Sequence, residues 1–121
     1  IPYATIQNQR GEWVEATAET ISAAASGEIP ADTRTSITNS NAAGAYPIAT
    51  FTWVIIYKEQ NYSDRSKEQA IATLDLLQYI LSDNAQNITS EVHYAPLPAK
   101  AKELSLRNLK TVTYDGVTIL Q

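Results

Sequence analysis

The sequence predicts an α/β protein whose main sheet is not wholly encoded in this chain. Strand-like segments alternate with helix-like segments, which is typical of layered α/β folds. The strongest strand candidate, Ile48 to Tyr57, becomes apolar on both faces toward its end, like a strand covered by helices on both sides. Sheets average about five to six strands, more than this chain offers. We therefore expect it to complete a sheet encoded partly elsewhere.

Composition limits the classes of function. The 121 residues suit one domain or a piece of a larger one. A net charge of −4 disfavours a nucleic-acid partner, and the absence of Cys excludes disulfides and thiolate chemistry. No apolar run is long enough to predict a membrane span. Because the chain starts at Ile1 and holds no Met, we expect a processed product or a fragment.

The N-terminal third predicts short strands and turns. Tyr3 to Gln7 and Glu12 to Glu15 are strand candidates on either side of a turn at Arg10-Gly11. Thr33 to Thr38 is rich in β-branched residues and predicts another strand. Asn39 to Gly44 has the composition of a loop.

A short helix is predicted between these strands, over Ala18 to Ser26. Thr17 is a favourable N-cap, because its hydroxyl can accept from a backbone N–H of the first turn. Gly27 is expected at the position after the C-cap, where a left-handed residue often ends a helix.

The longest helix is predicted from a cap at Ser63 or Asp64 to about Ser82. An interruption at Asp83-Asn84 should precede a second helical stretch to about Ser90. Apolar residues at helical spacing form the expected core stripe: Ala70, Ile71, Leu74, Leu77, Ile80 and Leu81.

The C-terminal part predicts an extended segment, a helix and a hairpin. Prolines fix His93 to Pro98 as extended, with Pro98 at the first position of a helix over Ala99 to Leu109. Asp115-Gly116 between two short strands predicts a type I′ turn. The buried candidates of the helix are Leu104, Leu106 and Leu109.

Three motifs in order resemble one protein family. The run from Gly44 to Lys58, the sequence Tyr94-Ala95-Pro96-Leu97-Pro98, and the stretch from Pro2 to Gly27 are similar to segments of the phosphate-binding proteins of bacterial phosphate ABC importers. The resemblance covers nearly the whole chain and weakens from about Thr111 onward.

This resemblance implies a two-lobed periplasmic-binding-protein fold (type 2-like), with mixed sheets flanked by helices. This chain would be its C-terminal portion. Residues 1–43 would end the second lobe, residues 44–47 would form a hinge crossover, and residues 48–121 would be the C-terminal part of the first lobe. The Ile48 to Tyr57 strand would enter the first lobe's sheet antiparallel to its neighbours.

The resemblance also implies a non-enzymatic role: capture of inorganic phosphate and delivery to an ABC transporter permease. The protein would be periplasmic or extracellular, or anchored to a membrane by sequence before Ile1. The family's ligand residues lie in a Thr-rich turn and an Arg-x-x-x-Ser-Gly-Thr stretch. Arg34 is followed by Thr-Ser-Ile-Thr and Arg65 by Ser-Lys-Glu-Gln, so neither matches. We expect no ligand-binding, catalytic or metal residue in this chain, and no cofactor.

Other candidate residues have simpler structural explanations. The single histidine, His93, lacks a nucleophile and an orienting carboxylate, so it is expected to be a loop residue. Asp83, Asn84 and Asn87 lack the spacing of a calcium loop and better fit a break between helices.

Several charged and aromatic residues also allow both a functional and a structural interpretation. Glu12, Glu15 and Glu19 could be paired carboxylates, but a solvated strand end and a helix start fit better. Arg34 could reach an anion in a cleft, although a surface ion pair is expected. Trp13, Tyr46 and Trp53 could form an aromatic platform; Trp53 is expected in the core instead.

Two alternative functions remain open at this stage. The chain could be an interaction module that self-associates through the Ile48 to Tyr57 strand. It could also be part of a solute-binding protein for another oxyanion, such as tungstate or sulfate. The partner would therefore be the remainder of a binding protein or a second copy.

Overall fold

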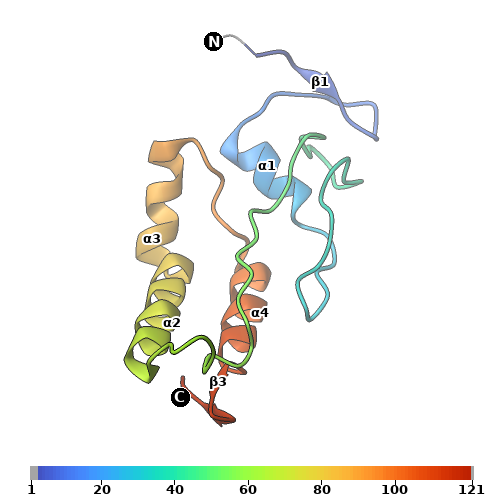
Figure 1. Cartoon of the computed structure of the whole chain (residues 1–121). Coiled ribbons are helices and arrows are strands. Elements are labelled where there is room, and N and C mark those ends of the chain that lie inside the picture. Colours follow the sequence, from blue (N-terminus) through green and yellow to red (C-terminus); the bar gives the residue numbers. More distant parts are fainter. Residues whose placement is uncertain (1–2, 121) are drawn as a thin grey trace.

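The computed structural model describes residues 3–120 and has a mixed α/β content, as predicted. Helices dominate, and the strands form two small antiparallel pairs (Figure 1). In chain order the elements are β1 (Ile6–Gln7), β2 (Trp13–Val14), α1 (Ala18–Ala24), α2 (Lys67–Leu81), α3 (Asp83–Ile88), the 3₁₀ turn Thr89–Val92, α4 (Ala99–Leu109), β3 (Thr113–Tyr114) and β4 (Val117–Thr118).

The N-terminal hairpin is confirmed, with shorter strands than predicted. Ile6 pairs with Val14 and Gln7 with Trp13, in antiparallel register. Gly11 has a φ of +80°, which glycine adopts without steric cost, and the predicted turn lies there.

Helix α1 is confirmed at its start and is shorter than predicted at its end. The Thr17 hydroxyl accepts from the Thr20 N–H, and the Thr20 hydroxyl in return accepts from the Thr17 N–H. The C-cap is Ala25, and Gly27 is not in the left-handed region, so its predicted role was wrong. The chain leaves the helix through an ordinary turn, in which Ser26 N–H donates to the Ala23 carbonyl.

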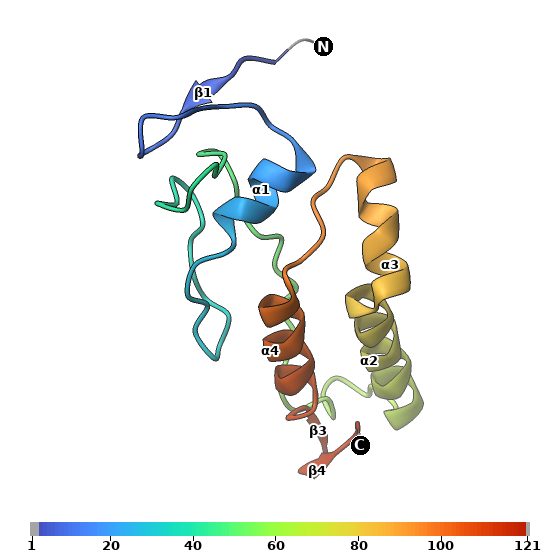
Figure 2. The same ribbon diagram turned by 180° about the vertical axis from the view of Figure 1, so that it is seen from behind.

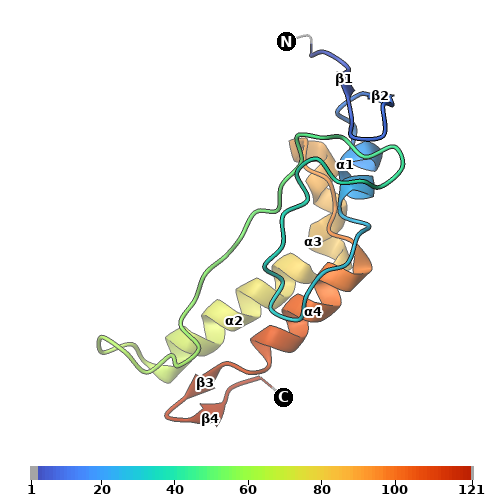
Figure 3. The ribbon, with the colours of Figure 1, turned by 90° about the vertical axis from the view of Figure 1, so that its right-hand side faces the viewer.

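The two strands predicted over Thr33 to Thr38 and Ile48 to Tyr57 are not formed within residues 3–120. A strand needs a hydrogen-bonded neighbouring backbone, and within residues 3–120 neither segment is paired in this way. Thr33 also has a φ of +60°, outside the extended region. Figure 3 shows residues 48–57 (green) as an extended trace that passes beside the helices without a partner strand.

Helix α2 begins later than predicted, at Lys67. Ser63 and Asp64 have φ values of +48° and +59°, so neither can cap a right-handed helix. Ser66 is the N-cap and forms a capping box with Gln69. The Ser-x-x-Gln pattern at 66–69 was the signal that could have placed this boundary.

The remaining C-terminal elements follow the predictions with small differences. Helix α2 breaks at Ser82, one residue before the predicted interruption, and α3 starts at Asp83. His93, predicted to be extended, has a left-handed φ of +61°. Helix α4 has the predicted bounds, although Pro98 is its N-cap rather than its first residue. Asp115 and Gly116 have φ values of +53° and +74°, as a type I′ turn requires.

The core is divided into three small clusters. The first surrounds α1 and the loop after it, the second lies between Ile29 and α4, and the third joins α2, α4 and the C-terminal hairpin. Figure 2 shows α4 beside α2. Ala70 and Leu74 of the predicted α2 stripe are fully buried, whereas Ile71 and Ile80 are exposed.

Within residues 3–120, no helix is both long and apolar enough to cross a membrane.

Candidate functional site

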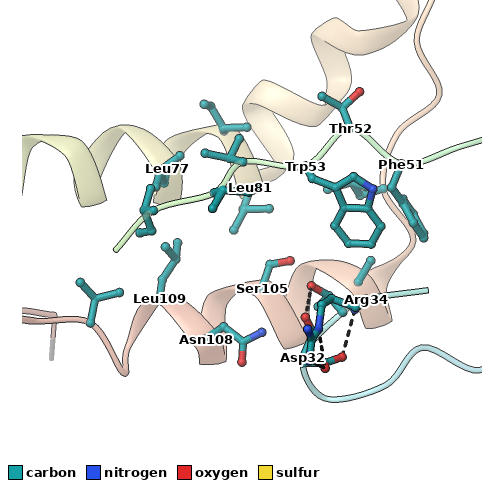
Figure 4. A pocket seen from close by; sticks show the side chains of 18 of the residues that line it. Asp32, Arg34, Phe51, Thr52, Trp53, Leu77, Leu81, Ser105, Asn108 and Leu109 are labelled. Carbon is teal, nitrogen blue, oxygen red and sulfur yellow. Dashed lines mark hydrogen bonds and ion pairs between the residues drawn. The ribbon is translucent and has the colours of Figure 1, made fainter. Parts of the chain in front are cut away.

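An open cleft of about 470 Å³ lies beside the segment 51–58. The second half of α2 and one face of α4 form its other walls (Figure 4). Leu77 and Leu81 face it from α2, and Leu109 from α4. Most of the lining is apolar: Ile29, Phe51, Trp53, Val54, Ile55, Ile56, Leu77, Ile80, Leu81, Leu97, Ala101, Leu109 and Val112.

The segment beside this cleft exposes an unusual amount of apolar surface. Ile55 is 93% exposed, Tyr57 70% and Val54 65%. Within residues 3–120, the backbone N–H groups of residues 50–57 have no hydrogen-bond partner. Unpaired extended backbone with apolar side chains is a template for pairing with another strand. The site therefore has the chemistry of an incomplete sheet and core.

The C-terminal hairpin holds residues 58–60, which directly follow the unpaired segment. The Lys58 carbonyl accepts from the Thr113 N–H at 2.8 Å, and the Gln60 N–H donates to the Thr113 carbonyl at 2.8 Å. These bonds make a parallel bridge between Glu59 and Thr113. The chain thus begins a strand pairing beyond residue 57 that residues 50–57 do not continue.

Glu59 fixes this junction, and sequence reasoning missed it. Its carboxylate accepts from the backbone N–H groups of Asn61, Asp115 and Gly116 and from the Thr113 hydroxyl, at 2.8–3.0 Å. These donors, the Asn61 N–H first, lower the pKa of Glu59 to about 2. No local pattern predicts this, because three of the four donors, on Thr113, Asp115 and Gly116, lie more than 50 residues away in the chain.

Polar residues are a minority of the cleft lining: Asp32, Thr33, Arg34, Thr52, Lys58, Ser105, Asn108 and Thr111. Arg34 lies at its rim, where the guanidinium Nε donates to the Asp32 carboxylate at 2.9 Å. The hydrogen bonds from the Arg34 N–H and side chain lower the pKa of Asp32. Arg34 therefore forms a surface ion pair, as the sequence predicted, and the Asp32 carboxylate balances its charge.

The three candidate glutamates do not converge on one point. Glu12 accepts at 2.8 Å from Asn8 Nδ2 and at 2.8 Å from the Gly44 N–H. Those bonds, the Asn8 bond first, lower the pKa of Glu12. Glu15 is exposed, and Glu19 lies in the first turn of α1. The structural interpretation of these carboxylates holds, with an added bonding role for Glu12.

The remaining polar candidates are also structural. His93 is exposed and has a φ of +61° after the 3₁₀ turn. Asp83 starts α3 and forms an ion pair with Lys102 of α4, which lowers its pKa. Across residues 3–120, no group of three His, Cys, Asp or Glu side chains is placed to hold a metal.

The aromatic candidates do not form one platform at the cleft. Trp53 lines the cleft and stacks edge-to-face on Phe51, with ring centroids 5.6 Å apart. It is 44% exposed, so its predicted core position is wrong for this chain. Trp13 is 70% exposed on β2, and Tyr46 is half-buried; neither lines the cleft.

Buried amide side chains were a further feature that the sequence did not reveal. The Gln86 side chain accepts from the Leu97 N–H at 2.7 Å and donates to the Ile80 carbonyl at 2.9 Å. It thereby holds the Tyr-Ala-Pro-Leu-Pro segment against the α2–α3 junction. Gln60, only 1% exposed, follows the C-terminal end of the unpaired segment.

Fold and site together define an α/β chain with an unpaired strand-like segment and an open apolar cleft. Comparison with curated proteins finds phosphate-binding protein PstS of Xylella fastidiosa Temecula1, 34% identical over 99 residues. The match covers 79% of this chain and 26% of that protein. The PstS protein of Xylella fastidiosa 9a5c is 33% identical over the same shares, and that of Methanocaldococcus jannaschii is 27% identical over 93% of this chain and 31% of its own length.

Over most of its length, this chain is a homologue of the phosphate-binding proteins named PstS, which confirms the resemblance found in the sequence. The chain spans about a quarter to a third of the length of these relatives. No model of a known protein family matches the chain, and the comparison with solved structures found no significant match.

Proposed function

We propose that this chain is the C-terminal part of a two-lobed, extracytoplasmic phosphate-binding protein that delivers inorganic phosphate to an ABC transporter permease. The observation that carries the proposal is the homology to phosphate-binding proteins over 79% of the chain. The curated relatives carry phosphate in their names, which does not favour another oxyanion. The proposed role is binding and transport, without catalysis.

The open cleft supports an architectural role for this chain within that protein. Residues 1–43 would end the second lobe, residues 44–47 would cross between the lobes, and residues 48–121 would complete the first lobe. In this arrangement residues 50–57 gain strand neighbours from the rest of the first lobe. Side chains from the rest of the first lobe would then cover Ile55, Leu77 and Leu81, which line the cleft and are at least partly exposed in this chain.

Phosphate itself would be held by residues outside this chain. Arg34 is paired with Asp32, and the lining of the cleft is mostly apolar. Proteins of this kind close two lobes around a ligand, which shifts a population from open to closed states. This chain would supply one crossover between the lobes and the helices that cover one sheet.

The test compares the isolated chain with a chimera. In the chimera, this chain replaces the homologous stretch of the Xylella fastidiosa Temecula1 protein. Isothermal titration calorimetry should detect phosphate binding by the chimera and none by the isolated chain. Micromolar binding by the isolated chain, or a folded chimera that binds no phosphate, would contradict the proposal.

A further inference from the structure

Arg65, one residue before the N-cap of helix α2, forms no ion pair within residues 3–120. The cations of the ion pairs in that range are Arg10, Arg34, Lys100 and Lys102. A guanidinium stays charged at every pH at which proteins fold, so Arg65 cannot lose its charge by releasing a proton. Its positive charge is therefore balanced by no carboxylate contact in this part of the chain.

The guanidinium of Arg65 also has unused hydrogen-bond donors. Nη2 donates to the Gln69 carbonyl at 3.1 Å and to the Thr73 hydroxyl, which are both neutral acceptors. Nη1 makes one long bond, at 3.4 Å to the Tyr62 hydroxyl. Nε is shielded from solvent and has no partner among the described residues. Because a shielded donor without an acceptor costs free energy, this chain leaves the needs of Arg65 unmet.

The surroundings of Arg65 hold its side chain and backbone in place. Its Cζ lies 5.7 Å from the centre of the Tyr62 ring, and that ring packs edge-to-face on Tyr57, with centroids 4.9 Å apart. The Tyr114 hydroxyl of β3 donates to the Arg65 carbonyl at 2.9 Å. A group that is positioned in advance loses little conformational entropy when it binds a partner. The guanidinium is therefore prepared to receive an anion.

A second pocket, of about 340 Å³, lies between this guanidinium and the unpaired segment. Among the described residues, no Asp or Glu and no second cation lines it. The lining includes Ile55, Ile56 and Tyr57 of the segment, and Tyr62, Arg65 and Thr73 after it. In the proposed arrangement, a strand from outside this chain pairs with residues 50–57 and would therefore pass beside the pocket.

We propose that this strand, from the part of the first lobe that lies outside this chain, presents an Asp or Glu carboxylate to the unused donors of Arg65. The inference rests on the proposed function, which supplies the strand. The relatives have enough further sequence to provide it, since this chain matches 26% to 31% of their lengths.

The charge of the pocket favours a carboxylate over a free phosphate ion. One carboxylate carries a single negative charge and balances the single guanidinium of Arg65. A phosphate dianion would leave excess negative charge among Ile55, Ile56 and the tyrosine rings, with no second cation in the lining.

The ion pair would fix the register of the incoming strand. Residues 50–57 carry apolar side chains on both faces toward their end, so hydrophobic contacts alone discriminate poorly between neighbouring registers. A slip by one residue turns every side chain of a strand to the opposite face. Such a slip would move the acidic side chain away from Arg65 and leave both charges unpaired, which is strongly unfavourable when they are buried.

Urea unfolding of the chimera and of the isolated chain tests the ion pair. Arg65→Gln removes the bonds to Gln69 and Thr73 in both proteins, but it leaves a buried carboxylate unpaired only in the chimera. The unfolding equilibrium constant should therefore rise by roughly a hundredfold more in the chimera than in the isolated chain. Arg34→Gln is the matched control, because the partner of Arg34 lies within this chain; its effect should stay below about fivefold and be the same in both proteins.

Two more variants separate charge from packing. Arg65→Lys keeps the positive charge and should recover at least about tenfold of the loss in the chimera, whereas Arg65→Met keeps only the apolar stem and should recover none. An equal effect of Arg65→Gln in both proteins, or equal stability of the Lys and Met chimeras, would overturn the inference.

NMR of the unmodified proteins with ¹⁵N-labelled arginine needs no variant to fold. At least one side-chain N–H signal of Arg65 should move downfield from the isolated chain to the chimera, while the Arg34 Nε–H, already bonded to Asp32, should stay in place. An unmoved Arg65 signal would contradict the inference. Inorganic phosphate added to the isolated chain should not shift Arg65; a saturable shift would assign the pocket to a free anion and also overturn it.

These outcomes are distinguishable from failure of the proposed function. A chimera that binds phosphate in calorimetry but shows no effect at Arg65 refutes the ion pair alone. A folded chimera that binds no phosphate refutes the proposed function.

Discussion

Ile55→Asp should destabilise the chimera and leave the isolated chain almost unchanged. Ile55 is 93% exposed, and its backbone N–H has no partner within the described residues, so a polar replacement in the isolated chain removes almost no buried contact. Surface substitutions of this kind change the free energy of unfolding by about 0.5 kcal/mol or less. The same side chain should be covered by sheet neighbours in the whole protein.

The magnitude in the chimera follows from two contributions. Burial of an isoleucine side chain stabilises by about 1.5–3 kcal/mol, and nearly all of this surface is available at Ile55. An unpaired polar group in a dry site costs a further ~1–3 kcal/mol. The chimera should therefore lose about 2.5–6 kcal/mol of its free energy of unfolding, enough to unfold a marginal protein.

Urea unfolding followed by circular dichroism measures both free energies. Val117→Asp is the control, because Val117 is also exposed and β-branched but lies on β4 and does not line the cleft. A loss above about 2 kcal/mol in the isolated chain would mean that residue 55 packs within it. An unchanged chimera would mean that nothing covers the segment, and the incomplete-sheet reasoning would be refuted.

Three further predictions concern the isolated chain. Leu74→Ala should lower the free energy of unfolding by about 2–5 kcal/mol in urea, because Leu74 is fully buried in the α2–α4 cluster, whereas Leu76→Ala, at a 58% exposed position on the same helix, should cost little. Similar losses in both would contradict that packing. Ser66→Ala should cost about 1 kcal/mol by removing the α2 cap, and Ser63→Ala, three residues earlier, should be neutral in the same measurement; a larger loss at Ser63 would restore the boundary predicted from the sequence. The contribution of the Glu59 carboxylate to the free energy of unfolding should be complete above about pH 4.5 and be lost as the pH falls toward 2. The reason is that the pKa of Glu59 in the folded chain lies below its ordinary value of 4.5. The Gly116 amide shift in NMR should then titrate near pH 2 in the unmodified chain and lose this step in Glu59→Gln; a midpoint near 4.5 would show that the carboxylate is not held.

Helix caps and tight turns could be predicted from the sequence, because residues close together in the chain form them. The Thr17 cap, the break near Ser82, the bounds of α4 and the Asp115-Gly116 turn were all found from neighbouring residues. Their hydrogen bonds connect residues close in sequence, so a short stretch specifies them. The similarity to phosphate-binding proteins was visible for the same reason, because the shared motifs are contiguous runs.

Long-range contacts were decided only by the tertiary structure. Glu59 meets donors more than 50 residues away, and Glu12 binds the Gly44 N–H 32 residues away, which no local pattern indicates. The sequence determined that residues 48–57 have strand chemistry, with apolar side chains on both faces. Whether they form a strand depends on a second backbone, because a sheet hydrogen bond needs two partners. Within residues 3–120, the tertiary structure pairs no second strand with them.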